Sequence, residues 1–191
     1  MKTMRIICTA LACVLLLAAC AKPPTVEMNN ATEAVARAEN DTNAVLYAPN
    51  SVARARDALD RMQREADSKR YDAAKTYAAE AVAAAEKAIA DGQSGALRAR
   101  DEAAELITEL KPAIAETEHE LGSARTKGLD VDLPALNSEF GEVKLNAEEA
   151  ETALSDSQYQ QALEKGRSAR AGLSDINRQL SDAIISSSRK K

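Results

Sequence analysis

Residues 71–90 read YDAAKTYAAEAVAAAEKAIA, and this alanine-rich stretch decides the fold class of the chain. Alanines recur in it at steps of four and three residues, which is the spacing of one face of an α-helix. These alanines are Ala74, Ala78, Ala81, Ala85 and Ala88. Alanine is the best helix former and its side chain is small, so the stretch predicts a long helix that neighbouring helices approach closely.

We expect this long helix to run from Tyr71 to about Lys127 and to end before a glycine. Gly92 and Gly95 should loosen or kink it, and Pro112 should bend it, because proline lacks a backbone donor. Apolar residues still recur at helical spacing beyond the glycines: Ala103, Ile107, Leu110 and Ile114. A continuous helix of this length, about 85 Å at about 1.5 Å per residue, would make the protein elongated.

Four shorter helices are predicted around the long one. The first two cover about 31–40 and 52–67, with an irregular connection at 41–50 between them. The last two cover about 132–154 and 159–185 and have the strongest apolar repeats in the chain. Their repeats are Leu136, Phe140, Val143, Ala147, Ala150 and Leu154, followed by Ala162, Gly166, Ala169, Leu173, Ile176, Leu180 and Ala183. The predicted fold is therefore all-α, an elongated bundle of about five helices.

The helices form two related hairpins joined through the long helix. One hairpin begins at Ala48-Pro49 and turns back before Tyr71, and the other begins at Leu133-Pro134 and turns back before Tyr159. Tyr159 follows Tyr71 by 88 residues, and an alanine stands three residues after each tyrosine. This arrangement resembles the second helix of tetratricopeptide-type hairpins, in which the ring packs over the turn.

The N-terminus has the pattern of a bacterial export signal. Lys2 and Arg5 precede an almost wholly apolar run over 6–19, which is shorter than a membrane-spanning helix needs. Leu17-Ala18-Ala19-Cys20 closes the run and resembles the bacterial lipobox. The resemblance implies that residues 1–19 are a cleaved signal peptide. It also implies that Cys20 carries diacylglycerol and an amide-linked fatty acid such as palmitate, which together anchor the chain stably to a membrane.

Several expectations follow from lipidation of Cys20. Cys8 and Cys13 would leave with the signal peptide, so the exported domain would have no thiol for a disulfide or a metal. Ala21 is not the aspartate that retains lipoproteins in the inner membrane of well-studied diderm bacteria, which favours the periplasmic side of the outer membrane. The expected divisions are 1–19 signal peptide, 20–30 lipidated cysteine and flexible tether, 31–127 first hairpin with the long helix, 128–185 second hairpin and 186–191 basic tail.

The first hairpin resembles an uncharacterised bacterial family, domain of unknown function forty-three ninety-eight. The likeness rests on Tyr47-Ala48-Pro49, the Val52/Ala55/Leu59 helix, Tyr71-Asp72-Ala73-Ala74 and the alanines up to Ala88. It covers about 31–89, and the second hairpin departs from it in having Leu133 before its proline. The resemblance implies an envelope-anchored helical fold and no particular activity.

Charge and residue types argue against nucleic-acid binding and catalysis. Loss of Lys2 and Arg5 would change the net charge from −5 to −7, which disfavours nucleic acid. His119 is the only histidine, and we expect it to face solvent rather than bind a metal. The carboxylates lie opposite the apolar faces, and neither a Gly-x-Ser-x-Gly elbow nor a phosphate-binding loop is present. We therefore expect no enzyme and no cofactor, with a hydrolase of unrecognised site as the weakest alternative.

The remaining candidates concern partners. Tyr71, Tyr77 and Tyr159 could form an interaction surface, although core packing at the hairpin turns is the favoured role. Lys191 ends a basic tripeptide that resembles the terminus of the major peptidoglycan-linked outer-membrane lipoprotein, which suggests cell-wall attachment as a minor alternative. The predicted function is structural: a lipid-anchored scaffold for other envelope proteins. The competing hypothesis is a tetratricopeptide-like module that binds a peptide between its hairpins.

Overall fold

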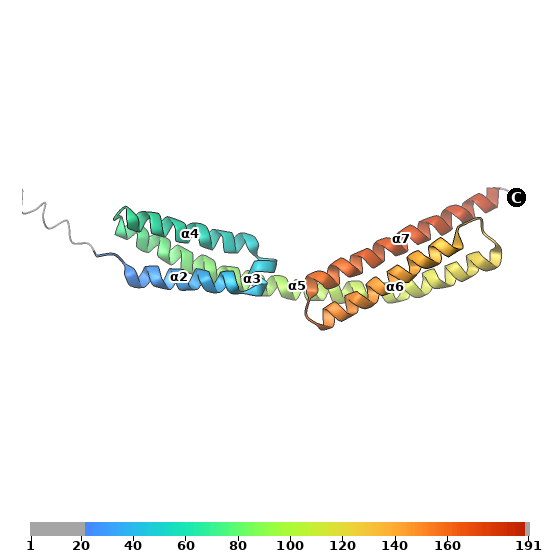
Figure 1. Ribbon diagram of the computed structural model, residues 1–191, viewed down its shortest axis with the longest axis horizontal. Coiled ribbons are helices and arrows are strands. Elements are labelled where there is room, and N and C mark those ends of the chain that lie inside the picture. Colours follow the sequence, from blue (N-terminus) through green and yellow to red (C-terminus); the bar gives the residue numbers. More distant parts are fainter. Residues whose placement is uncertain (1–21, 190–191) are drawn as a thin grey trace, which may run out of the picture. The chain divides into compact units, whose positions relative to one another are not determined.

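The computed structural model describes residues 22–189, and all regular secondary structure in this range is helical (Figure 1). The helices are α2 (Thr25–Asn40), α3 (Thr42–Tyr47), α4 (Pro49–Asp67), α5 (Tyr71–Lys127), α6 (Leu133–Ser155) and α7 (Tyr159–Arg189). The all-α prediction is confirmed. The predicted signal peptide, Cys20 and Lys191 lie outside the described residues. Between residues 22 and 189, no helix has both the length and the apolarity that crossing a membrane requires.

Helix α5 is continuous from Tyr71 to Lys127 and includes Pro112. The chain is helical at Gly92 and Gly95, where a loosening or kink was expected. These glycines instead allow close packing, since an added Cβ at Gly92 would lie 2.4 Å from the backbone nitrogen of Ala44. The helix ends where predicted, because Gly128 adopts a left-handed φ of 61° that glycine tolerates.

The chain divides into two compact units, and the boundary lies inside α5, between Gly95 and Ala96. The sequence pattern placed this division at Gly128, where the long helix ends. The boundary differs because the two halves of α5 pack in different cores. Its first half buries alanines against α2 and α4, and its second half contacts α6 and α7.

The first unit, residues 22–95, is a bundle of α2, α4 and the first half of α5. Helices α2 and α4 run antiparallel (Figure 1), and Glu39 near the end of α2 pairs with Arg56 in the first half of α4. The core consists of small residues around Met62, which is 1% exposed. Its other buried members are Ala31, Ala34, Val35, Ala38, Ala44, Val52, Ala55, Ala58, Ala78, Ala81, Ala85 and Ala88.

Helix α2 begins at Thr25, six residues before the predicted start at Ala31. Pro24 precedes its first turn and its carbonyl accepts a hydrogen bond from the Met28 amide at 3.0 Å. Met28 then packs against the core of the first unit. Residues 25–30 of the expected flexible tether are therefore helical, because Met28 adds one more apolar contact to the same helix face.

The connection expected at 41–50 also contains helix. Asp41 caps α3 by accepting a hydrogen bond from the Ala44 amide at 2.7 Å, and Ala44 is fully buried. Helix α4 then begins at Pro49, since proline is tolerated in a first helical turn. Ser51 lies inside α4, and its hydroxyl donates to Asp91 Oδ2 of α5 at 2.7 Å.

The second unit, residues 96–189, is a bundle of the second half of α5 with α6 and α7. The predicted repeats are buried apart from Ile114 of α5 and Leu154 of α6, which are both half-buried. Beside Leu154, Ala153 takes the core position. Gly166 and Gly172 are again sites of close approach: an added Cβ would lie 2.7 Å from Leu106 Cδ2 and 2.5 Å from Val143 Cγ2, respectively. The helices of this unit therefore pack closely through small residues.

Helix α7 continues to Arg189, so residues 186–189 of the expected frayed tail are helical. The hydroxyl of Ser186 donates to the carbonyl of Asp182 at 2.9 Å, and the hydroxyls of Ser187 and Ser188 donate to the carbonyl of Ile184 at 2.9 and 3.0 Å. The helix thus continues beyond its apolar repeat, and the serine hydroxyls bond back to carbonyls of the preceding turn.

Candidate interaction surfaces

The two hairpin turns have the same backbone geometry, which confirms the internal repeat. In the first, the Arg70 amide donates to the Glu65 carbonyl at 2.9 Å, and Lys69 has a φ of 59°. In the second, at the offset of 88 residues, the Gln158 amide donates to the Ala153 carbonyl at 2.8 Å, and Ser157 has a φ of 61°. Both turns are Schellman motifs, although a non-glycine residue occupies the left-handed position.

Tyr71 and Tyr159 lie beside these turns, whereas Tyr77 lies further along α5 and packs against the core of the first unit. Tyr71 and Tyr159 are the first residues of α5 and α7, and both side chains are half-buried. Tyr77 is also half-buried, with the guanidinium of Arg61 5.9 Å from its ring centroid. Tyr71 and Tyr77 belong to the first unit and Tyr159 to the second, so neither unit contains all of them.

His119 lines a groove between the end of α5 and the end of α7. The groove has a volume of about 530 Å³. Its apolar lining is Ala124, Leu129, Leu180, Ile184 and Ile185, and its polar lining is Glu116, His119, Glu120, Ser123, Lys127, Asn177 and Ser181. Ile184 and Ile185 are adjacent in the chain and each is 48% exposed. His119 is exposed at the rim.

The sequence patterns did not indicate this groove. Ile184 and Ile185 follow Ala183, the last residue of the apolar repeat of α7, and were assigned to the end of a helix rather than to a surface. The available signal was the adjacency of two isoleucines next to the repeat. A β-branched pair beyond the packed face adds apolar area that the bundle does not cover.

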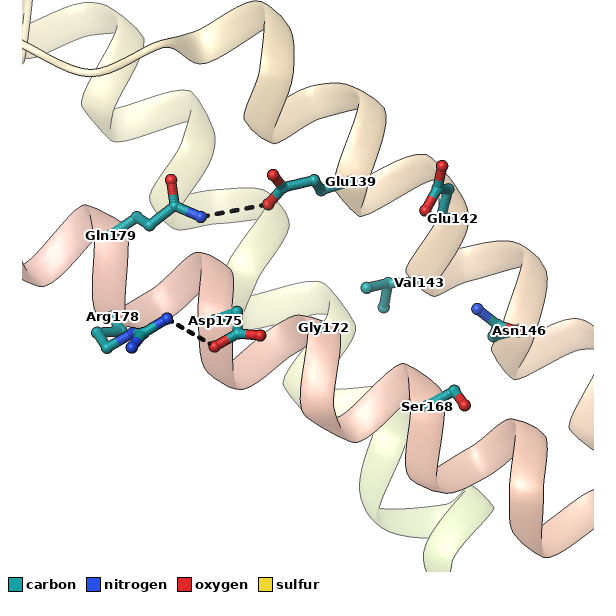
Figure 2. Close-up of a pocket in the computed structure, with 9 residues that line it drawn as sticks. All are labelled: Glu139, Glu142, Val143, Asn146, Ser168, Gly172, Asp175, Arg178 and Gln179. Carbon is teal, nitrogen blue, oxygen red and sulfur yellow. Dashed lines mark hydrogen bonds and ion pairs between the residues drawn. The ribbon is translucent and has the colours of Figure 1, made fainter.

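A second cavity, of about 300 Å³, opens between α6 and α7 (Figure 2). Two of its three acidic residues are engaged: Glu139 accepts a hydrogen bond from Gln179 Nε2 at 3.3 Å, and Asp175 pairs with Arg178 at 2.8 Å. In the part of the chain that the structure describes, no group of three His, Cys, Asp or Glu side chains is placed to hold a metal ion. The cavity is thus a polar surface hollow between paired charges.

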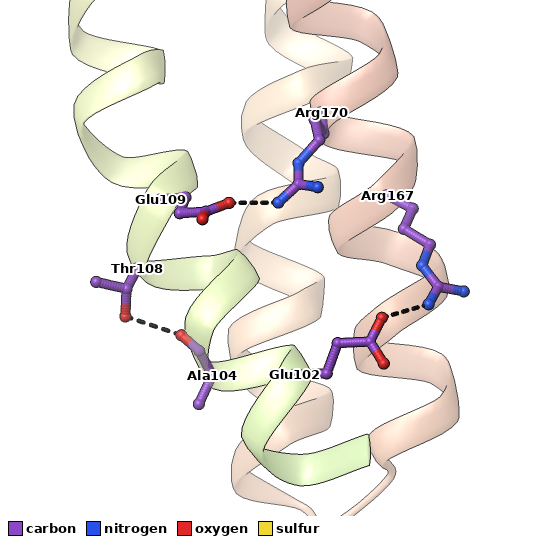
Figure 3. A network of polar contacts seen from close by, with 6 residues as sticks. All are labelled: Glu102, Ala104, Thr108, Glu109, Arg167 and Arg170. Atoms are coloured by element: carbon purple, nitrogen blue, oxygen red, sulfur yellow. Dashed lines mark hydrogen bonds and ion pairs between the residues drawn. The ribbon is translucent and has the colours of Figure 1, made fainter. Parts of the chain in front are cut away.

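The exposed charges join the helices of the second unit. Arg167 pairs with Glu102 at 2.6 Å, and Arg170 pairs with Glu109, so α7 is linked twice to α5 (Figure 3). Elsewhere, Lys111 pairs with Glu151 at 3.1 Å and Lys165 with Glu149 at 2.5 Å. The hydrogen bond to Glu149 raises the pKa of Lys165. Exposed pairs are individually weak, but their alternating signs favour one alignment of the helices.

The same kind of pair stabilises the first hairpin turn. Arg70 donates two hydrogen bonds to the carboxylate of Glu65, one of them from Nη2 at 2.9 Å. This bonding lowers the pKa of Glu65 and raises that of Arg70. The interaction therefore fastens the start of α5 to the end of α4.

One comparison with known proteins identifies part of the chain. Residues 26–105 match the model of the family described as Domain of unknown function (DUF4398). The matched segment begins in α2 and extends ten residues beyond Gly95, so it covers the first unit. The resemblance seen in the first hairpin is confirmed. Searches of curated proteins and of solved structures found no match.

Proposed function

We propose that this protein, whose residues 26–105 match the model of the Domain of unknown function (DUF4398), is a cell-envelope lipoprotein with a structural role. In this proposal Cys20 carries the lipid, and the two helical units hold or space other envelope components. The observation that carries the proposal is Leu17-Ala18-Ala19-Cys20 at the end of an apolar run. Small residues at the cleavage site followed by cysteine are what lipoprotein processing recognises.

The packing of both units supports a structural role. The interior of the first unit is mostly alanine, and that of the second unit combines alanines with leucines, isoleucines, a valine and a phenylalanine. Thr117 is the one fully buried polar residue among residues 22–189. The Thr117 hydroxyl donates to Asn177 Oδ1 at 3.0 Å, so it serves to join α5 and α7. Side chains of the described interior are thus occupied in holding helices together, as a scaffold requires.

Metabolic labelling tests the anchor. Cells expressing the full chain would be fed an alkyne-tagged palmitate analogue, and the protein would be isolated and tested for the tag. We expect Cys20→Ser to abolish labelling and to leave the protein in a soluble or unprocessed form. Cys8→Ser and Cys13→Ser are matched controls that should keep the label, because both positions precede the cleavage site. Labelling that survives Cys20→Ser would refute the proposal.

The proposed address is the periplasmic side of the outer membrane, and Ala21 supports it. Ala21→Asp would introduce the aspartate that retains lipoproteins in the inner membrane of well-studied diderm bacteria. Separation of the membranes by density should find the original protein with the outer membrane and Ala21→Asp with the inner membrane. An original protein that fractionates with the inner membrane would contradict this address.

The groove at the end of α7 favours a second candidate function, a peptide-binding module. A photo-crosslinking residue at Ile185 would detect an occupant of the groove in cells. Leu145, which is exposed on α6 and does not line the groove, is the matched control position. Discrete adducts at position 185 but not at 145 would support the binding module. Equal adduct patterns at both positions would count against it.

A further inference from the structure

We infer that one end of the first unit lies against the lipid head groups of the membrane that holds the anchor. This end consists of Lys22, Val26 and the α4–α5 turn with Tyr71, and we call it the anchor end. The inference rests on the proposed acylation of Cys20. Beyond that proposal, the inference specifies which part of the folded domain contacts the membrane.

Two ion pairs place these segments at the same end of the unit. Helices α2 and α4 run antiparallel (Figure 1), and Glu39 near the end of α2 pairs with Arg56 in the first half of α4. Lys75 in the first turns of α5 lies 3.6 Å from Glu27 in the first turn of α2. The start of α2, the end of α4 and the start of α5 are therefore neighbours, as the ribbon also shows (Figure 1).

The early start of α2 limits how far this end can lie from the bilayer. Only residues 21–24 separate Cys20 from the first residue of α2. Even fully extended, this link spans at most about 17 Å, at about 3.5 Å per residue. Helix α2 itself is 16 residues long, about 24 Å at about 1.5 Å per residue. A flexible tether that extended to residue 30 would be longer and would let the unit move further from the bilayer.

The side chains of the anchor end suit a head-group layer. Val26 is 67% exposed, so its apolar side chain is accessible to lipid. Tyr71 is half-buried, and its side chain has both an apolar ring and a polar hydroxyl, which suits the boundary between water and lipid. Lys22 and Lys69 are exposed and take part in no ion pair within the described range, which leaves their ammonium groups for lipid phosphates. The exposed carboxylates of Asp67 and Asp72 would resist deeper insertion.

Tryptophan quenching measures this contact without interference, because the chain contains no tryptophan. Val26→Trp places a reporter at the anchor end, and Leu46→Trp places one on α3 at the opposite end of α2. Both positions are exposed, so neither substitution changes the core. The acylated full-length variants would be reconstituted in phosphatidylethanolamine and phosphatidylglycerol vesicles that contain a lipid spin-labelled at its head group.

We expect quenching to be several-fold stronger at position 26 than at position 46, and absent at 26 when Cys20→Ser removes the lipid. Equal quenching, or none at either position, in protein shown to carry the fatty acid would overturn the inference and leave the anchor intact. Quenching at 26 that persists in Cys20→Ser would also overturn it, because contact would not depend on the link. A chain that carries no fatty acid would refute both proposals, and the labelling experiment identifies that case separately.

Discussion

Replacement of Gly92 by alanine tests whether α3 is held against α5 by the absence of a side chain. An added Cβ would lie 2.4 Å from Ala44 N and 2.6 Å from both Ala44 Cα and the Asn43 carbonyl carbon, where ordinary contact begins at 3.4 Å. The backbone of α3 would have to retreat by about 1 Å, because no side-chain rotation can relieve contacts with backbone atoms. Overpacking costs about 1–3 kcal/mol, while glycine to alanine in a helix gains up to about 1 kcal/mol. We expect a net loss of about 1–2 kcal/mol.

Gly122→Ala is the matched control, since Gly122 lies in the same helix and an added Cβ there would meet nothing within 4 Å. It should stabilise the protein by about 0.5–1 kcal/mol. Gly141→Ala, in α6, should behave in the same way. Urea unfolding followed by far-ultraviolet circular dichroism would compare the variants. Equal stabilisation by Gly92→Ala and Gly122→Ala would refute the packing argument.

Three further predictions concern the turns, the core and pH. Lys69 and Gly128 both have a left-handed φ, which glycine tolerates better than other residues. Lys69→Gly should therefore stabilise the protein by up to about 1 kcal/mol, and Gly128→Ala should destabilise it by about as much. Thermal melts that show the same sign of change for both variants would contradict this reasoning. Leu173→Ala should cost about 2–5 kcal/mol, and Leu154→Ala, at a half-buried position, clearly less; equal urea midpoints would show that the assignment of burial is wrong. Glu65→Gln should destabilise at neutral pH because hydrogen bonds from its arginine partner lower the pKa of Glu65 in the folded state. That difference should shrink as pH falls from the ordinary carboxyl pKa through the folded one, and melts at a series of pH values would reveal a constant difference if the reasoning fails.

Periodicity predicted the helices of this protein well because helical spacing depends only on neighbouring residues. The repeating alanines of α5, which are Ala74, Ala78, Ala81, Ala85 and Ala88, are buried as their spacing indicated. The hairpin turns lie directly before Tyr71 and Tyr159, as predicted. The helix at 42–47 was missed because its one buried residue, Ala44, gives no repeat. It is held by a capping aspartate and by contact with a glycine about fifty residues later in the chain.

The sequence by itself determined the helical class, the internal repeat and the lipobox hypothesis, since each depends on the order of residues along the chain. Only the tertiary structure decided what Gly92 and Gly95 do, because a glycine that weakens a helix and one that admits a neighbouring backbone look the same in sequence. It also decided that the boundary between units falls inside α5, and that Ile184 and Ile185 are left uncovered. The role of the glycines, the boundary between units and the exposure of the isoleucines all depend on which helices pack against each other. An apolar repeat along one helix does not specify which other helix it packs against.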